Sequence, residues 1–178
     1  MNTPNSQSRA NPSPQEAGLS QDDANQNGTN QGFADQAYAD QAYTDLGFAG
    51  NISPQVACQW WQAGDAVLID VRTDAEREWV GFVPGAVPAA WKLWPGMALN
   101  PTFDETLKAA MQATLPAGKK ALMLCRSGIR SIAAAKRATE LGFEAYNILE
   151  GFEGDPDAQA HRGVTGGWRC LGLPWRQG

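Results

Sequence analysis

The stretch Ala121-Leu-Met-Leu-Cys125-Arg-Ser-Gly-Ile-Arg130-Ser-Ile-Ala-Ala-Ala-Lys-Arg-Ala-Thr-Glu-Leu141 decides the fold of this chain. Four apolar residues, 121–124, come without a polar interruption and indicate a strand buried on both faces. After Gly128, apolar residues recur at spacings of three and four, which predicts a helix with Ile132 and Ala135 on its packed face. Cys125 therefore lies where a buried strand ends and a helix is about to begin.

The residues between Cys125 and Ser131 are expected to form a tight loop at the N-terminus of this helix. Backbone N–H groups at a helix N-terminus have no intrahelical partner, so they point at whatever the loop encloses and stabilise an anion. Arg126 and Arg130 add positive charge, and we expect much of the Cys125 side chain to be thiolate near neutral pH. The alternative is a structural cysteine buried at the end of a strand.

The length of the loop limits which group Cys125 can carry. Four residues separate Cys125 from Arg130, whereas the loop of cysteine phosphatases is one residue longer. The shorter cradle is too small for a phosphate on the cysteine, but it can surround one extra sulfur atom held as a persulfide. The sequence Cys125-Arg-Ser-Gly-Ile-Arg-Ser131 resembles the active loop of the rhodanese sulfurtransferases.

This resemblance implies a thiosulfate:thiophile sulfurtransferase. The Cys125 thiolate would take sulfane sulfur from a donor such as thiosulfate, hold it as a persulfide and pass it to a thiophilic acceptor. The resemblance implies neither a metal nor an organic cofactor. It makes Cys125 the catalytic residue and assigns substrate binding to the rest of the loop: Arg126, Ser127, Gly128, Ile129, Arg130 and Ser131.

Three further residues are expected to support the loop. Asp70 and Arg72 end the apolar run 66–72 on one face of a predicted strand, and they resemble the Asp-Val-Arg signature of rhodanese-type domains. A purely structural ion pair is the alternative for both. Glu76, in a short capped helix over 73–79, matches a glutamate common in that family. The segment 81–86 resembles the family's Gly-His-Ile-Pro-Gly-Ala, with Phe82 in place of the histidine.

The order of predicted elements indicates an α/β fold. We expect a three-layer domain over residues 50–176, with a central, mainly parallel five-stranded sheet flanked by helices. Residues 1–48 are acidic and of low complexity and are expected to be disordered. Their five-residue repeat at 34–43 fits a linker or a short recognition motif.

The family's terminal Glu-Gly-Gly pattern is interrupted after Gly151, which predicts an inserted loop over 152–165 at the rim of the active site. We expect His161 or Arg162 in this loop to help bind a substrate or a partner. A metal site built on His161 and the loop's acidic residues is disfavoured, because a single histidine among turn acids is usually solvated. Cys170 is either a structural residue or a resolving cysteine, and the spacing alone does not decide between them.

Charge and composition exclude several classes of function. The formal net charge of −5 falls entirely within residues 1–50, so the domain has no basic field for nucleic acid or an anionic membrane. No apolar run approaches the roughly 18–20 residues of a membrane span, and the N-terminus lacks a signal-peptide pattern. Three widely spaced cysteines suit a reducing compartment. We therefore expect a cytoplasmic protein.

Three hypotheses follow. The first is a sulfurtransferase acting on small donors and acceptors. The second is a persulfide carrier or delivery module that docks a protein partner through the tail or the loop 152–165. The third, a cysteine phosphatase or arsenate reductase, is disfavoured by the short loop. The sequence leaves open the physiological donor and acceptor and the oligomeric state.

Overall fold

A computed structural model describes residues 46–113 and 119–178. The repeat at 34–43 and most of the expected tail lie outside these residues. Of the residues assigned to the tail, 46–48 are described, and Phe48 is buried and packs in the hydrophobic core beside Val67 and Ala145. The packed domain therefore starts before residue 50, because the aromatic side chain of Phe48 belongs to the core.

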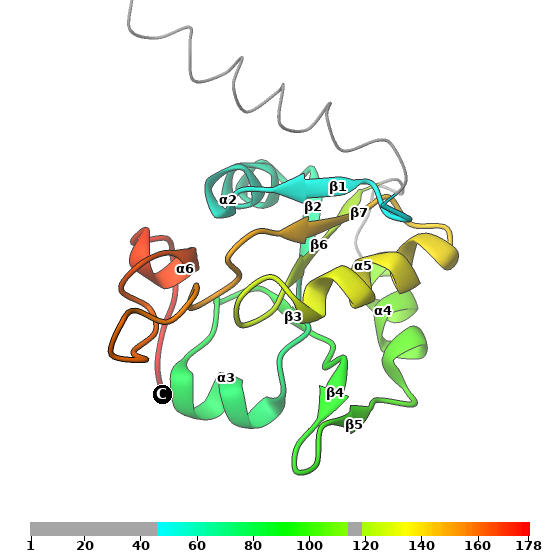
Figure 1. Cartoon of the computed structure of the whole chain (residues 1–178). Coiled ribbons are helices and arrows are strands. Elements are labelled where there is room, and N and C mark those ends of the chain that lie inside the picture. The colour runs from blue at the N-terminus through cyan, green and yellow to red at the C-terminus, as the bar shows by residue number, and fades with distance from the viewer. Residues whose placement is uncertain (1–45, 114–118) are drawn as a thin grey trace, which may run out of the picture.

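A parallel sheet of five strands forms the centre of the domain (Figure 1). Every neighbouring pair of strands in this sheet is parallel. The strand that contains the apolar run 121–124 occupies the middle position, as expected for a strand buried on both faces. In spatial order the strands are β1 (Gly50–Ile52), β7 (Ala145–Ile148), β6 (Lys120–Leu124), β2 (Ala66–Asp70) and β3 (Val87–Pro88).

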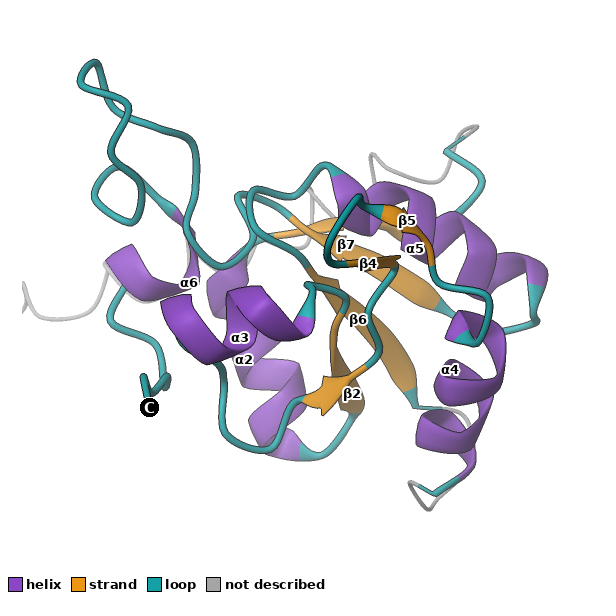
Figure 2. Ribbon diagram, turned by 90° about the horizontal axis from the view of Figure 1, so that it is seen from below, coloured by secondary structure: helices purple, strands orange, loops and turns teal. Residues whose placement is uncertain are grey.

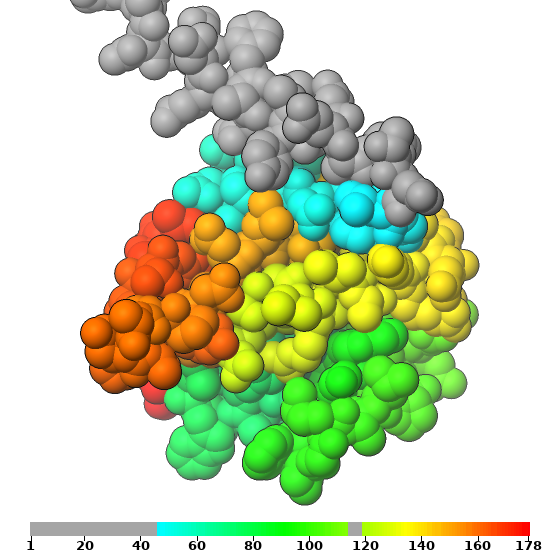
Figure 3. Space-filling view, in the orientation of Figure 1, coloured from blue at the N-terminus to red at the C-terminus, as the bar shows by residue number. Residues whose placement is uncertain are grey.

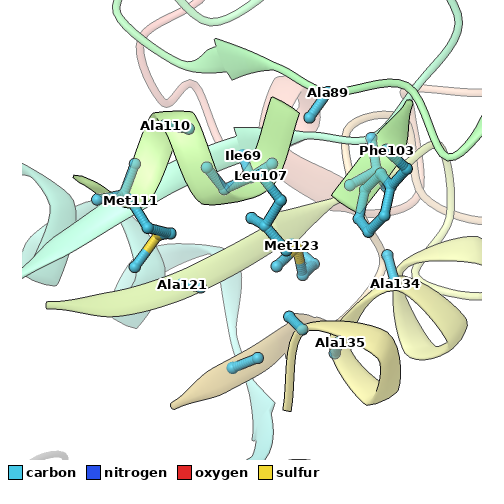
Figure 4. Packing of buried hydrophobic residues seen from close by; sticks show 14 of the residues in the cluster. Ile69, Ala89, Phe103, Leu107, Ala110, Met111, Ala121, Met123, Ala134 and Ala135 are labelled. Atoms are coloured by element: carbon cyan, nitrogen blue, oxygen red, sulfur yellow. The ribbon is translucent and has the colours of Figure 1, made fainter. Parts of the chain in front are cut away.

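Helices cover both faces of the sheet and confirm the three-layer α/β fold (Figure 2). On one face, α4 (Phe103–Gln112) and α5 (Arg130–Glu140) pack on β2 and β6. Figure 4 shows Leu107 of α4 beside Ile69 and Met123 of these strands. On the other face lie α2 (Pro54–Ala63) and the short α6 (Gly167–Cys170). The remaining helix, α3 (Asp74–Val80), follows β2.

Local sequence signals start helices α2 and α3, and α3 confirms the capped helix expected over 73–79. Ser53 caps α2 by accepting a hydrogen bond from the backbone N–H of Val56, and Gly64 ends it in the left-handed conformation. A capping box between Thr73 and Glu76 starts α3. Each of these helices thus starts through a contact between residues only three positions apart in the sequence.

One expectation was wrong. Ile132 was placed on the packed face of α5, but its side chain is 36% exposed, and the buried residues of this helix are Ser131, Ala134, Ala135 and Ala138. Small side chains on that face let the helix lie close to the sheet. After Trp91 the chain forms a hairpin of two short antiparallel strands, β4 (Lys92–Leu93) and β5 (Ala98–Leu99).

Within residues 46–113 and 119–178, no helix is long and apolar enough to cross a bilayer.

Candidate active site

Cys125 lies at the floor of a pocket of about 660 Å3, directly after the carboxyl end of β6. Only 1% of the residue is exposed, and it forms part of the lining of this pocket. The walls come from the active loop, the start of α3, the β4–β5 hairpin and the loop 152–165. The lining residues are Thr73, Ala75, Glu76, Val80, Trp94, Met97, Cys125, Arg126, Ser127, Ile129, Arg130, Asp155 and Arg162.

The backbone of the active loop rests on the turn that follows β7. The Phe152 N–H donates to the Cys125 carbonyl at 2.7 Å, and the Glu153 N–H donates to the Arg126 carbonyl at 2.8 Å. Gly151, at φ +60°, lies so close that a Cβ atom would come within 2.4 Å of the Cys125 carbonyl oxygen. The turn after β7 therefore fixes the shape of the loop from behind.

Of the predicted substrate-binding residues, Arg126, Ser127, Ile129 and Arg130 line the pocket, and Gly128 and Ser131 do not. Gly128 makes the turn of the loop at φ +83°, where its Cα faces the backbone of residues 148–150. Ser131 is fully buried, and its hydroxyl lies 3.1 Å from the Cys125 sulfur. Ser131 thus reaches the sulfur from behind the loop.

Glu76 holds Arg130 in place. The Arg130 Nη1 donates to Glu76 Oε2 at 2.8 Å, and its Nη2 also donates to the same carboxylate. Burial on its own would raise the pKa of Glu76, but hydrogen bonds from Arg130 and Thr73 and the charge of Arg130 lower it from 4.5 to about 2. Burial would lower the pKa of Arg130, and the Glu76 carboxylate raises it. Both groups are charged and bind each other across the mouth of the pocket.

Asp70 and Arg72 form a buried ion pair outside the pocket lining. The Arg72 Nη2 lies 2.6 Å from Asp70 Oδ2 and also donates to the Gly81 carbonyl at 2.9 Å. The guanidinium lies 3.9 Å from the centre of the Phe152 ring. Because Phe152 holds the Cys125 carbonyl, this pair connects the end of β2 to the support of the active loop.

The loop 152–165 reaches the rim of the pocket, where Figure 3 shows it in orange as a lobe beside the yellow surface of the active loop. Asp155 and Arg162 line the pocket, and Arg162 donates to the Gly154 carbonyl at 2.6 Å. His161 is not a lining residue; its side chain is 75% exposed and lies 3.7 Å from Asp157. Of the two candidates in this loop, only Arg162 lies at the site.

Cys58 and Cys170 lie outside the pocket. Cys58 is buried in α2, and this burial raises the pKa of its thiol. Cys170, at the end of α6, is exposed. In the part of the chain that the structure describes, no group of three or more His, Cys, Asp or Glu side chains is arranged to hold a metal ion.

Sequence reasoning missed the apolar walls of the pocket and the buried amides behind it. Trp94 and Met97 come from the turn between β4 and β5. The available signal was Trp94 beside Pro95 and Gly96, because a turn offers little core in which to bury a tryptophan. Asn147 carries no signal of its own within the apolar run of β7.

Comparisons with known proteins agree with this geometry. Residues 53–155 match a family model described as a rhodanese-like domain. A Rickettsia rickettsii protein described as an uncharacterized RP600 homolog is 34% identical over 113 residues, which is 63% of this chain and 84% of that protein. The crystal structure of Rv0390 from M. tuberculosis has 42% identity and a TM-score of 0.64, over 74% of this chain and 99% of that one. The match to the family model includes Cys125 and its loop.

Proposed function

This chain belongs to the rhodanese-like domain family, and we propose that it is a sulfurtransferase that carries sulfane sulfur on Cys125. The observation that supports this most directly is the position of the Cys125 sulfur at the floor of a pocket, inside a loop whose spacing to Arg130 is too short for a phosphate. Cys125 also lies at the carboxyl ends of the parallel strands, which is where ligands bind in open α/β sheets.

The reaction is written in two steps. The Cys125 thiolate attacks the outer sulfur of thiosulfate, the S–S bond of the donor breaks, and sulfite leaves with the electron pair. The product on the enzyme is the persulfide anion Cys125–S–S⁻, so the charge balances. A nucleophilic acceptor then attacks the terminal sulfur and regenerates the thiolate; with cyanide, the product is thiocyanate.

Two arginines at the pocket favour the binding of an anionic sulfur donor. Arg126 is exposed at the mouth and Arg162 approaches from the loop 152–165. Arg130 is paired with Glu76, so its charge is partly neutralised before any donor arrives. We assign the attraction of the donor's sulfonate mainly to Arg126 and Arg162, and the holding of the loop to Arg130.

A second candidate, a persulfide carrier for a protein partner, is supported by the apolar rim. Ile129 is 72% exposed and Trp94 is 67% exposed, and both line the pocket. A small anion such as thiosulfate leaves these side chains in water, whereas an extended protein segment that presents a cysteine would cover them. In this case the loop 152–165 or the tail is the proposed docking element.

The test is thiocyanate formation from thiosulfate and cyanide. The full chain should turn over, Cys125→Ala should not, and Cys170→Ser should match the parent because Cys170 lies outside the pocket. Turnover of the Cys125 variant would contradict the proposal. Hydrolysis of a small aryl phosphate that depends on Cys125, without any thiocyanate, would favour the phosphatase alternative instead. In the carrier case, a cysteine-containing protein acceptor would be used better than cyanide, and Trp94→Ala would lower only that preference.

A further inference from the structure

A chain of hydrogen bonds leads from the Cys125 sulfur into the sheet. The Ser131 hydroxyl is placed to donate to the Cys125 sulfur at 3.1 Å and to Asn147 Oδ1 at 2.6 Å. The Asn147 Nδ2 in turn donates to Asn51 Oδ1 at 2.8 Å. Asn51 and Asn147 are partners in the parallel register of β1 and β7, so their amides lie side by side. Ser131 and Asn147 are buried, and Asn51 is half-buried on the edge strand.

The direction of these bonds depends on the protonation of Cys125. A hydroxyl has a single proton, so Ser131 can donate to only one of these two acceptors at a time, and Asn147 lies nearer than the sulfur. When the proton goes to Asn147, Ser131 turns a lone pair toward the sulfur, which a thiol can satisfy by donating its own proton. A thiolate has no proton to donate, and needs the Ser131 proton for itself. Donation from Ser131 to Asn147 is therefore complementary to the thiol.

A thiolate or persulfide anion is matched by the reversed arrangement. If Ser131 donates to the sulfur, Asn147 must turn its amide so that Nδ2 donates to Ser131 and Oδ1 faces Asn51. Asn51 must then turn its own amide to donate to Asn147. The oxygen and NH₂ ends of an amide are nearly equal in size, so both arrangements fit the same buried space.

We propose that Asn147 and Asn51 are positioning residues, whose amide orientation sets whether Ser131 donates a hydrogen bond to the Cys125 sulfur. Their role in sulfur transfer rests on the proposed function, but their effect on the thiolate does not. An amide at position 51 can present either its oxygen or its NH₂ group to Asn147, so it permits both orientations of the Asn147 amide.

Other groups act on the same sulfur without using this chain. The charged side chains that line the pocket with Cys125 come from α3, the active loop and the loop 152–165, and the N-terminus of α5 faces it as well. These charges act on the sulfur through space, so a test of the relay has to separate their effect from the effect of the hydrogen bonds. They are Glu76, Arg126, Arg130, Asp155 and Arg162.

Asn51→Asp tests the relay, with Asn51→Leu as its matched control. A carboxylate at 51 accepts hydrogen bonds only, which fixes Asn147 with Oδ1 on Ser131 and keeps the Ser131 proton away from the sulfur. A leucine at 51 leaves Asn147 free to turn. The readout is the rate of alkylation of Cys125 by iodoacetamide from pH 5 to 10, measured on the Cys125 peptide by mass spectrometry, so that Cys170 does not contribute.

For Asn51→Asp we expect alkylation at pH 7 to be about tenfold slower, with a pH midpoint displaced upward, because one hydrogen bond to a charged group is lost. Asn51→Leu should stay within about threefold of the parent by the same reasoning. Equal slowing in both variants would show that Asn51 has only a structural role in the edge strand, and would overturn the proposal. An unchanged rate in Asn51→Asp would overturn it as well.

A double-mutant cycle with Ser131→Ala separates the relay from the direct effect of the charge that Asn51→Asp adds. In a Ser131→Ala background the relay is cut, so Asn51→Asp should slow alkylation by less than about twofold. The same slowing in both backgrounds would mean a through-space effect and no relay. Alkylation needs no sulfur donor, so this test does not depend on the proposed function. If the parent shows this alkylation pattern but forms no persulfide with thiosulfate, the relay stands and the sulfurtransferase proposal fails. If the parent forms the persulfide but the alkylation pattern is absent, the sulfurtransferase proposal stands and the relay fails.

Discussion

The carboxylate of Glu76, at the start of α3, binds the guanidinium of Arg130, the first residue of α5, with Nη1 to Oε2 at 2.8 Å. The two residues are 54 positions apart in the chain. Glu76 also caps its own helix through Thr73, so one carboxylate fixes two helix starts on opposite sides of the pocket. The active loop is thereby tied to α3 at its far end and to the turn after β7 at its near end.

This pair makes stability sensitive to acid. The pKa of Glu76 lies at about 2, below its ordinary value of 4.5. Its contribution is therefore fully present above about pH 5 and is lost as the pH falls toward 2. The free energy of unfolding of the parent should exceed that of Glu76→Gln by about 1–2 kcal/mol at pH 7, allowing for solvent screening at this partly exposed position.

Urea unfolding between pH 7 and pH 2.5 measures this difference. The gap between the two proteins should stay constant down to about pH 5 and shrink below it. A gap that grows in acid would have the wrong sign for a carboxylate with a lowered pKa.

The buried pair of Asp70 and Arg72 is expected to matter for folding. Asp70→Asn leaves the guanidinium of Arg72 buried without its counter-charge, while its Nη1 already lacks a hydrogen-bond partner. Removing one partner of such a pair destabilises a protein by about 3–5 kcal/mol. Asp74→Asn, at a residue whose side chain is 89% exposed, should change stability by less than about 1 kcal/mol in the same urea titration.

Gly151 should be required for the shape of the active loop. In Gly151→Ala, the new Cβ meets the Cys125 carbonyl oxygen at 2.4 Å and the Ser127 nitrogen at 2.8 Å, so the loop has to move. Sulfur transfer should fall by at least tenfold, because misplacement of a reacting group by about 1 Å can cost 10²-fold. Gly142→Ala is the matched control: it has φ +90° but no atom within 4 Å of the new Cβ.

The control separates backbone strain from displacement of the loop. Gly142→Ala should lose about 1 kcal/mol of stability through its left-handed conformation and retain its rate of thiocyanate formation. Equal activity in the two folded variants would mean that the turn after β7 does not shape the active loop.

Arg126 should affect the binding of an anionic donor more than the chemistry. Its side chain is exposed at the mouth of the pocket. Arg126→Gln should raise the KM for thiosulfate roughly two- to fivefold with a smaller change in kcat, as expected for one exposed charge. The difference should diminish at high salt, because screening weakens an exposed charge. A change confined to kcat would place Arg126 in the chemical step.

The strand, loop and helix around Cys125 were predictable because their signals are local. An apolar run, a glycine that turns the loop and a helical period of small residues are all contained within residues 121–141. The N-cap at Ser53 and the capping box at Thr73 are local in the same sense. The central parallel sheet followed from the alternation of apolar strands and helices, whereas the order of its strands did not.

The groups that complete the site could not be predicted, because they depend on contacts between distant segments. The pairing of Glu76 with Arg130, the apolar wall at Trp94 and the support by Gly151 all arise only once the chain is folded. The burial of Phe48 shows the same limit, since a single aromatic residue after a polar tract has no periodic pattern to mark it. Asn51 and Asn147 meet because β1 and β7 are neighbours in the sheet.

The central claim is that Cys125 carries an additional sulfur atom as a persulfide, and measurement of the intact mass tests it most directly. The reduced full chain is incubated briefly with thiosulfate and its mass is measured before and after cyanide is added, beside Cys125→Ser. We predict a gain of about 32 Da, one sulfur atom, that cyanide removes and that the variant never shows. A folded, reduced parent protein that gains no mass, or a Cys125→Ser variant that gains the same mass, would contradict the account.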